Sequence, residues 1–402
     1  MEEKELLKSI IFENYDNIAF IIGNGIHRYY NNNAISWEGL LKELWKQYVD
    51  KSLSNFPSEG ISNTEFYDLV ELNYMRRFNT TDYADKLRTC IQSVDASKID
   101  ISKLKLAEII TAQAVELNLN PNNIQFKTKN LKSYSDTLKK ISDDLRRNIN
   151  PDCNDLSDAD IVIRLSNVIS NESMRRIYMN SIKKQIAKNM DEWENSNVAT
   201  LVQYIRDINA PIMTTNYDKI LEKSISCKKF IKKKENSNEY INKRDFSDYY
   251  PWNVYYSDEE KTDFGIWHIN GIIDYPRSIK LGLCDYMGCV EKARKMIQGK
   301  SVFEIEAFEG KNTDYWSGYN TWLHYIFNKD LFIFGLGLNK DETFLRWLLI
   351  QRAKYSTISQ KPVKGWYVDR NINHGKKMFL EVLGFKVIEI NDFKVLYEDI
   401  WK

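Results

Sequence analysis

Pro211-Ile212-Met213-Thr214-Thr215-Asn216-Tyr217-Asp218 is the most informative segment of the sequence. An apolar run from Ile205 to Met213 leads into it, and Lys219 to Lys223 then resumes with helical character. This order predicts a buried strand, a polar turn at its carboxyl end and a helix. In open parallel α/β sheets, ligands lie in the crevice outside the carboxyl ends of the strands. We therefore expect Asn216 and Asp218 to face a ligand.

The composition is that of an ordinary globular chain. Its 402 residues are 43% hydrophobic and 28% charged, enough for one large domain or two smaller ones. The formal net charge of +1 gives no global field that favours nucleic acid or membrane, so only a local patch could make such a contact. The N-terminus lacks a cationic segment followed by a long apolar one, and no apolar run is long enough to span a bilayer. We expect a cytoplasmic protein.

The cysteines predict no metal. There are five, at irregular spacing and without a CxxC pair, so neither a zinc ribbon nor a disulfide framework is supported. Cys284 and Cys289 could approach each other on a helix, but two lone thiols are more often packed than metal-bound.

A second strand with a polar turn lies near the N-terminus. Ile18 to Ile22 is apolar and stops at Gly23-Asn24-Gly25-Ile26-His27. A glycine turn after a strand brings a phosphate close to backbone N–H groups, although GxG alone is weak evidence. Ser36 then predicts the N-cap of a helix, whose apolar residues recur at helical spacing from Trp37 to Val49.

The middle of the chain predicts a helical insertion. Residues 53–207 are polar and poor in glycine, with helical spacing in four segments, and they separate the first part of a sheet domain, 1–52, from its remainder, 208–402. The four segments are Leu104 to Leu119, Tyr134 to Arg147, Asp160 to Met190 and Thr200 to Ile208.

The last part alternates strands and helices. The predicted strands are Phe264 to Ile269, Leu331 to Phe334, Val363 to Val368 and Phe385 to Ile390. Helices are expected after Leu281 to Tyr286 as far as about Ile297, through Phe344 to Leu348, and from about Gly375 to Leu383 with Gly384 as C-cap. The basic run Lys228 to Lys234 favours a solvated loop or edge strand over a phosphate or partner contact. We predict an α/β fold: a Rossmann-like, mostly parallel sheet with helices on both faces, plus the helical insertion subdomain.

Four turns now share small or amide residues where a ligand would lie. They are Gly23 to His27, Thr214 to Asp218, His268 to Gly271, and Gly335 to Asp341. Their order and content resemble the sirtuin-like superfamily, in particular its divergent bacterial branch in anti-phage defence proteins. The most specific part is Thr-Thr-Asn-Tyr-Asp followed by Glu222; Ser36-Trp37 and Cys284-Asp285-Tyr286 add to it. The resemblance covers roughly Ile18 to Trp45 and Ile208 to Ile390.

The resemblance implies NAD+ as substrate and assigns roles to residues. Asn216 would orient water or ribose hydroxyls, and Asp218 would bond to the ribose or brace its turn. The family places a histidine immediately before the glycine of the third turn, but here that residue is Asn270 and His268 lies two positions earlier. His268 could reach the pocket from the same strand face as a base, or be a hydrogen-bonded core histidine. The residues expected to bind the nucleotide are Gly23, Asn24, Gly25 and Ile26 at the pyrophosphate, Gly335, Gly337 and Asn339 at the adenosine end, and His27, Thr215 and Asn270.

The function implied is an NAD+ glycohydrolase that releases nicotinamide and ADP-ribose as the effector of an abortive-infection system. A non-catalytic NAD- or ADP-ribose-binding scaffold subunit is the alternative. Protein deacylation ranks low because the zinc ribbon of deacetylase sirtuins has no counterpart. Relatives of this kind imply a homo-oligomer that works with a separate partner such as a HerA-type hexameric ATPase, without zinc or membrane. Direct nucleic-acid binding stays open.

Overall fold

The computed structural model describes residues 3–30, 36–49, 60–76, 198–232, 252–258, 263–273, 278–298 and 316–402. The chain divides into two compact units, one formed by Met1–Asp68 with Arg175–Lys402 and the other by Leu69–Met174. The helices predicted between Leu104 and Met190 lie outside the described residues. The helical insertion and its bounds, 53–207, therefore stay a prediction.

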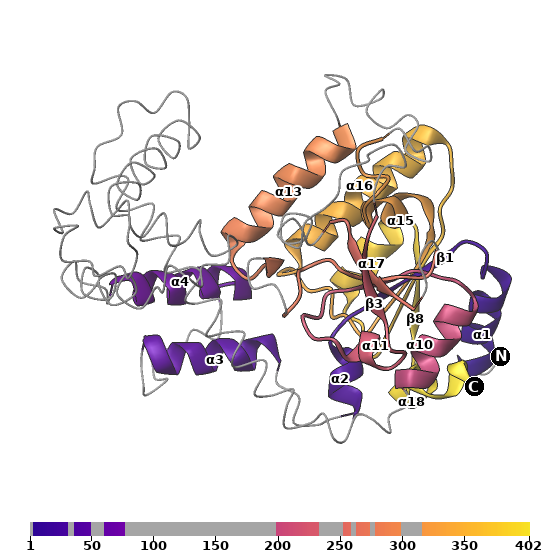
Figure 1. The fold of residues 1–402 in the computed structure, drawn as a ribbon, viewed down its shortest axis with the longest axis horizontal. Helices are drawn as coiled ribbons and strands as arrows, with labels where there is room; N and C mark the ends of the chain where they lie inside the picture. The colour runs from indigo at the N-terminus through magenta and orange to yellow at the C-terminus, as the bar shows by residue number, and fades with distance from the viewer. Residues whose placement is uncertain are drawn as a thin grey trace, which may run out of the picture. The chain divides into compact units, whose positions relative to one another are not determined.

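An eight-stranded sheet in the order β3-β4-β5-β2-β1-β6-β7-β8 forms the centre of the first unit (Figure 1). Six of its strands form one continuous parallel set, and β4 pairs antiparallel with both β3 and β5. The prediction of a mostly parallel α/β sheet is confirmed. The strands are β1 (Ile18–Ile22), β2 (Ile212–Thr214), β3 (Lys228–Ile231), β4 (Val254–Ser257), β5 (Ile266–His268), β6 (Asp330–Phe334), β7 (Gly365–Asp369) and β8 (Phe385–Glu389).

Helices connect these strands. In the part of the chain that the structure describes they are α1 (Glu3–Glu13), α2 (Gly25–Tyr30), α3 (Trp37–Tyr48), α4 (Asn63–Arg76), α10 (Val198–Asp207), α11 (Ile220–Lys223), α13 (Leu283–Gln298), α15 (Leu323–Asn328), α16 (Thr343–Ser359), α17 (His374–Val382), α18 (Phe393–Tyr397) and the 3-10 helix η4 (Asp399–Trp401). No helix of these segments combines the length and the apolar character that a membrane span requires.

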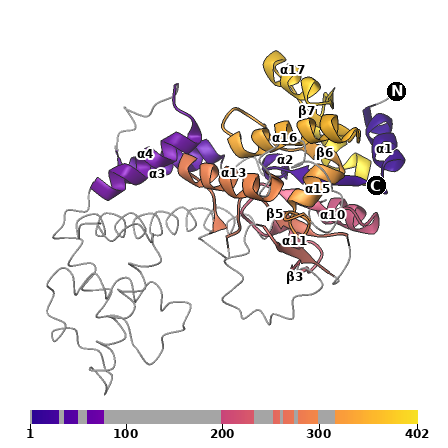
Figure 2. The ribbon, with the colours of Figure 1, turned by 90° about the horizontal axis from the view of Figure 1, so that it is seen from above.

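Alternate residues of the central strands face two different helical layers, as the period of a strand requires. Ala19 and Ile333 belong to a core shared with buried residues of α13, α15 and α16, which lie beside one another in Figure 2. Phe20 packs instead against Phe332 and the C-terminal Trp401, with ring centroids 5.7 and 5.9 Å away. Helices therefore cover both faces of β1.

The predicted strand from Ile205 to Met213 is wrong in its first half. Ile205 is a buried residue of α10, together with Val198, Leu201 and Val202 at helical spacing. The helix ends at Asp207 and Asn209 adopts a left-handed φ of 54°, so the apolar run is divided between a helix and the short strand β2. The overlapping prediction of a helix over Thr200 to Ile208 is confirmed.

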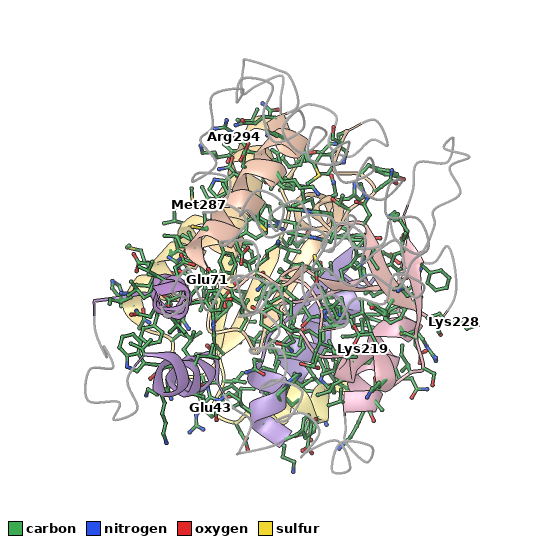
Figure 3. The ribbon with its side chains drawn as sticks, turned by 60° about the vertical axis from the view of Figure 1, so that its left-hand side comes forward. Glu43, Glu71, Lys219, Lys228, Met287 and Arg294 are labelled. Carbon is green, nitrogen blue, oxygen red and sulfur yellow. The ribbon has the colours of Figure 1, made fainter. Side chains whose placement is uncertain are left out.

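Several local predictions hold. Ser36 caps α3 by accepting a hydrogen bond from the Gly39 N–H at 3.1 Å. Gly384 follows α17 with φ +84°, the left-handed conformation that ends many helices. The basic run begins as the edge strand β3, whose first residue, Lys228, is exposed (Figure 3). The structure adds elements that the sequence did not predict, among them α1, α4, β4, α15, α18 and η4.

The strand order reverses around β1. After β1 and its neighbour β2 the chain forms the edge strand β3, returns inward through β4 to β5, and then crosses to β6 on the other side of β1 before β7 and β8. Ile22, the last residue of β1, pairs with Thr214 of β2 and with Phe334 of β6, while Thr214 pairs with His268 of β5. The polar turns after these four strands therefore begin at one edge of the sheet.

Candidate functional site

The side chain of Asn216 lies against the first glycine turn. Its Nδ2 donates to the Gly23 carbonyl oxygen at 3.3 Å and is 3.2 Å from Nε2 of His27. A carbonyl only accepts, so the atom that faces Gly23 must be the amide nitrogen. With both amide hydrogens used, Oδ1 is left without a hydrogen-bond partner among the described residues. Asn216 therefore presents an oriented acceptor.

His27 is held in one tautomer by the same contacts. Because its Nε2 accepts from Asn216, the ring proton belongs on Nδ1, which lies 3.3 Å from Oδ2 of Asp218. The other carboxylate oxygen of Asp218 accepts from the Ile220 N–H at 3.0 Å, at the start of α11. Asp218 thus braces the turn and fixes the ring that in turn fixes Asn216.

His268 supports the backbone of the same asparagine. It is 1% exposed, and its Nδ1 lies 2.7 Å from the backbone oxygen of Asn216, so Nδ1 must donate. Its Nε2 forms a short hydrogen bond with Oε1 of Glu222, which is 2% exposed. Both ring nitrogens are therefore engaged inside the protein.

Two histidine–carboxylate pairs thus hold Asn216 from two directions. His27 and Asp218 fix its side chain, and His268 and Glu222 fix its main chain. Burial alone lowers the pKa of His268, but the charge of Glu222 and the hydrogen bonds to Glu222 and Asn216 outweigh it and raise the pKa above 6.5. His268 thus supports the main chain of Asn216 from within the core, which is the second of the two roles that the sequence leaves open for it.

Other polar side chains in these turns have unused hydrogen-bonding capacity. No side-chain hydrogen bond involves Asn24 in the first turn, Thr215 in the second or Asn270 in the third, among the residues that the structure describes. Asn270 is 6% exposed and its backbone oxygen accepts from the Lys280 N–H at 2.9 Å, which fixes the turn. Together with Oδ1 of Asn216, these groups can bind a polar ligand at the sheet edge.

The glycines of the first and fourth turns pack against each other. The Gly23 N–H donates to Phe334 O at 3.1 Å and the Gly25 N–H to Gly335 O at 2.6 Å. These two N–H groups, expected to meet a pyrophosphate, are thus used by the protein itself. Ile26, also expected there, has its side chain fully buried in the core. The glycines are required because the two turns touch, with Gly335 at φ +66°.

We predict that Gly25→Ala destabilises the fold by about 1–3 kcal/mol, because overpacking displaces backbone. The added Cβ would lie 2.5 Å from the Tyr397 hydroxyl and 2.6 Å from Cα of Gly335. Chemical denaturation measures the change. Gly288→Ala is the matched control: it lies within α13 with nothing within 4 Å of the added methyl, so it should raise stability by about 0.5–1 kcal/mol. Equal effects of the two variants would contradict the packing argument.

The His268 pair predicts a pH dependence of stability. Its folded pKa lies above the ordinary 6.5, so the stabilisation is complete below pH 6.5 and is lost as the pH rises through the raised value. We expect the free energy of unfolding to fall as the pH rises above 6.5. Glu342, whose pKa burial raises to about 7, changes stability in the same direction. Denaturation of Glu222→Gln across this range isolates the histidine: its slope should be shallower than that of the wild type, and an unchanged slope would contradict the assignment.

The residues expected at the adenosine end lie along one loop. Gly335 touches the first turn, the Gly337 carbonyl accepts from Lys376 Nζ at 3.0 Å, and Asn339 lines a cavity of about 420 Å³. The structure therefore brings Gly335 to the site of Asn216, whereas Asn339 belongs to the neighbouring cavity.

Two residues that hold the site in place could not be predicted from the sequence, Glu222 and Tyr397. Glu222 was noticed only as part of a motif, and its pairing with His268 could not be seen because 46 residues separate them. Tyr397 of α18 stacks on Tyr29 at 5.0 Å and its backbone oxygen accepts from Tyr30 at 2.9 Å, which fixes α2 against the C-terminal segment. No local signal marks a contact that spans 367 residues.

Within the described segments, no group of three or more His, Cys, Asp or Glu side chains has the arrangement of a metal site. Cys227, Cys284 and Cys289 are free thiols. Comparison with known proteins adds no assignment: no protein-family model matches the chain, and no curated protein is significantly similar to it.

Proposed function

We propose that this chain is an NAD+ glycohydrolase that produces nicotinamide and ADP-ribose, and that it is the effector of a bacterial abortive-infection defence. The observation that carries the proposal is Asn216, whose side-chain oxygen is oriented by two bonds to its amide nitrogen at the carboxyl edge of a parallel sheet. The resemblance of the four turns to the sirtuin-like family supplies NAD+ as the substrate.

The strand order supports a Rossmann-like dinucleotide site. The segment β5-β2-β1-β6-β7-β8 corresponds to the Rossmann order 3-2-1-4-5-6, in which a dinucleotide lies across the point where the order reverses. Here that point lies between β1 and β6, and the turns of Gly23 and Gly335 follow these two strands.

The arrangement suits cleavage of a bond that needs little acid catalysis. Nicotinamide leaves NAD+ as a neutral molecule, and positive charge develops on the ribose. Oδ1 of Asn216 can accept a hydrogen bond from the attacking water or a ribose hydroxyl, and its dipole stabilises that charge. Water adds to the anomeric carbon as the bond to nicotinamide breaks, and one proton is released.

Neither buried histidine is placed to act as a free base. His268 uses both nitrogens on Asn216 and Glu222, and the nitrogens of His27 face Asn216 and Asp218. In this proposal they position Asn216, and the released proton passes to solvent. Asn24, Thr215 and Asn270 supply hydrogen bonds to the nucleotide.

A second candidate function is a non-catalytic NAD- or ADP-ribose-binding scaffold. It is favoured by His268, because both ring nitrogens of that residue bond to the protein itself. Asn270 occupies the position of the family histidine and His268 is buried behind it, so a chain that had lost its base would have this site.

The test is incubation of the purified chain with NAD+, with nicotinamide and ADP-ribose resolved over time. Equal release of both products supports hydrolysis. NAD+ binding without turnover, also with the natural partner added, favours the scaffold. Absence of binding contradicts both proposals.

The resemblance to the sirtuin-like family also supplies a proposal for the oligomeric state and the partner protein. We propose a homo-oligomer in the cytoplasm that works with a separate protein such as a HerA-type hexameric ATPase. Light scattering of the chain alone and with that partner measures this, and a monomer under both conditions would count against it.

A further inference from the structure

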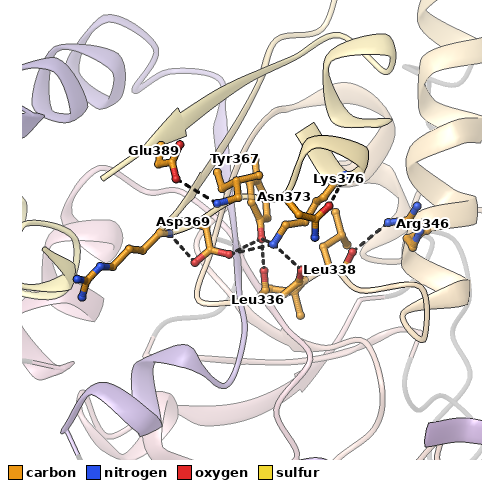
Figure 4. Close-up of polar contacts among 11 residues, drawn as sticks. Leu336, Leu338, Arg346, Tyr367, Asp369, Asn373, Lys376 and Glu389 are labelled. Atoms are coloured by element: carbon orange, nitrogen blue, oxygen red, sulfur yellow. Dashed lines mark hydrogen bonds and ion pairs between the residues drawn. The ribbon is translucent and has the colours of Figure 1, made fainter. Parts of the chain in front are cut away.

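A cavity of about 420 Å³ lies beside the loop after β6. Its walls are residues 338–341 of that loop, Arg346 of α16, and Asn373, Gly375 and Lys376 around the start of α17 (Figure 4). This volume is in the range of small-molecule sites and exceeds what a single small ion needs. Gly335 and Asn339 are four residues apart, so at most about 14 Å separates the cavity wall from the turn at Gly23.

Arg346 is oriented but electrostatically uncompensated. Its Nη1 donates to Leu338 O at 3.0 Å, and its guanidinium stacks on Phe379 with 3.7 Å from Cζ to the ring centroid. Its Nε and Nη2 have no hydrogen-bond partner among the described residues, and no carboxylate pairs with it there. Desolvation lowers its pKa. A fixed guanidinium with an open edge is a receptor for an oxyanion.

The start of α17 forms another part of the wall. Asn373 accepts from the Lys376 N–H at 2.9 Å and caps the helix, which leaves other first-turn N–H groups without intrahelical acceptors. Gly375 adds no side chain in front of them, since a Cβ there would meet only Oδ1 of Asn373, at 3.7 Å. This end of the helix therefore favours an anion in the cavity.

The side-chain charges have the matching sign. Lys376 Nζ forms an ion pair with Asp369 at 3.2 Å and donates to the Tyr367 hydroxyl at 3.1 Å (Figure 4). It thereby neutralises Asp369, the carboxylate of β7 near the cavity. Lys340 is exposed and forms no ion pair within the described segments. Lys340 and Arg346 thus leave an excess of positive charge over Asp341, the acid in the wall.

We propose that this cavity binds a phosphate monoester. Two sources share this chemistry: the 2′-phosphate of a dinucleotide substrate, which would make NADP+ preferred over NAD+, or a separate sugar phosphate that regulates the enzyme. The first source rests on the proposed function. The second does not.

Calorimetric titration of the full chain tests the site with ribose 5-phosphate, NADP+ and NAD+; the two dinucleotides are titrated into an Asn216→Ala background, in which hydrolysis is expected to be slow. We expect a phosphate monoester to bind at least tenfold more weakly to Arg346→Ala. Arg346→Lys keeps the charge but loses the planar guanidinium, so its affinity for the phosphate monoester should lie between those of the wild type and Arg346→Ala. Lys354→Ala is the matched control, because it removes an exposed cation of the same helix outside the cavity, and it should bind as the wild type does.

The titrations distinguish the two sources of the phosphate, the dinucleotide substrate and a separate sugar phosphate. Tighter binding of NADP+ than of NAD+, lost in Arg346→Ala, identifies the substrate's own phosphate. Equal binding of the dinucleotides with Arg346-dependent binding of ribose 5-phosphate identifies a separate ligand. The proposal is overturned if ribose 5-phosphate does not bind and NADP+ shows no advantage, or if binding is the same in a folded Arg346 variant. Failure of NAD+ hydrolysis alone leaves these results intact and counts only against the proposed function.

Discussion

Asn216→Ala is expected to lower the rate of NAD+ hydrolysis by roughly 10²- to 10³-fold, the loss typical when one positioned polar group is removed from an active site. The variant loses the oriented oxygen, and it leaves Gly23 O and His27 Nε2 without the amide that they face. Because the oxygen acts on charge that develops during bond breaking, kcat should fall more than KM changes.

Initial rates of nicotinamide release over a range of NAD+ concentrations measure both constants. Asn391→Ala is the control, since Asn391 is an exposed asparagine near the C-terminus that bonds to Glu3. Its rate should equal that of the wild type. A folded Asn216→Ala that retains wild-type kcat would remove Asn216 from the chemistry.

Glu222→Ala is expected to destabilise the fold by about 3–5 kcal/mol, the range for removing one partner of a buried ion pair. The imidazolium of His268 would then be buried without its counter-charge, or would lose its proton together with the hydrogen bond. The backbone of Asn216 would also lose a fixed donor, so activity should fall as well.

Denaturant unfolding at pH 6.5 measures the loss. Glu291→Ala provides the contrast, because Glu291 also pairs with a cation, Lys295 at 2.6 Å, but both side chains are exposed. Solvent screens such a pair, so no measurable change is expected there. If the two variants have equal stability, the buried pair does not hold the site.

The fold could be predicted from the sequence to the extent that apolar runs stop at polar turns. Ile18 to Ile22 and Leu331 to Phe334 are strands because β-branched and aromatic residues fill them and glycine follows. β4 was missed because Val254–Ser257 is short and directly follows an aromatic stretch interrupted by Pro251, so no separate apolar run marks it. The boundary inside Ile205 to Met213 was missed because a buried helix end and a buried strand have the same apolar character.

The candidate site was predictable by its turns but not by its pairings. Polar residues after adjacent parallel strands must meet at one edge, which placed Asn216 beside the glycine turn. The two hydrogen-bond chains depend on which histidine faces which carboxylate, and the sequence left His268 as either a base or a hydrogen-bonded core histidine. The structure pairs it with Glu222 and places His27 beside Asp218.

The proposed mechanism requires Oδ1 of Asn216 to face the ribose of a bound nucleotide. A crystal structure of the wild-type chain with ADP-ribose, the product that cannot be hydrolysed further at this bond, tests it most directly. We predict a ribose hydroxyl within hydrogen-bond distance of Oδ1, and the pyrophosphate beside the turns of Gly23 and Gly335. ADP-ribose bound away from Asn216, or none bound at saturating concentration, would show that Asn216 does not bind the ribose.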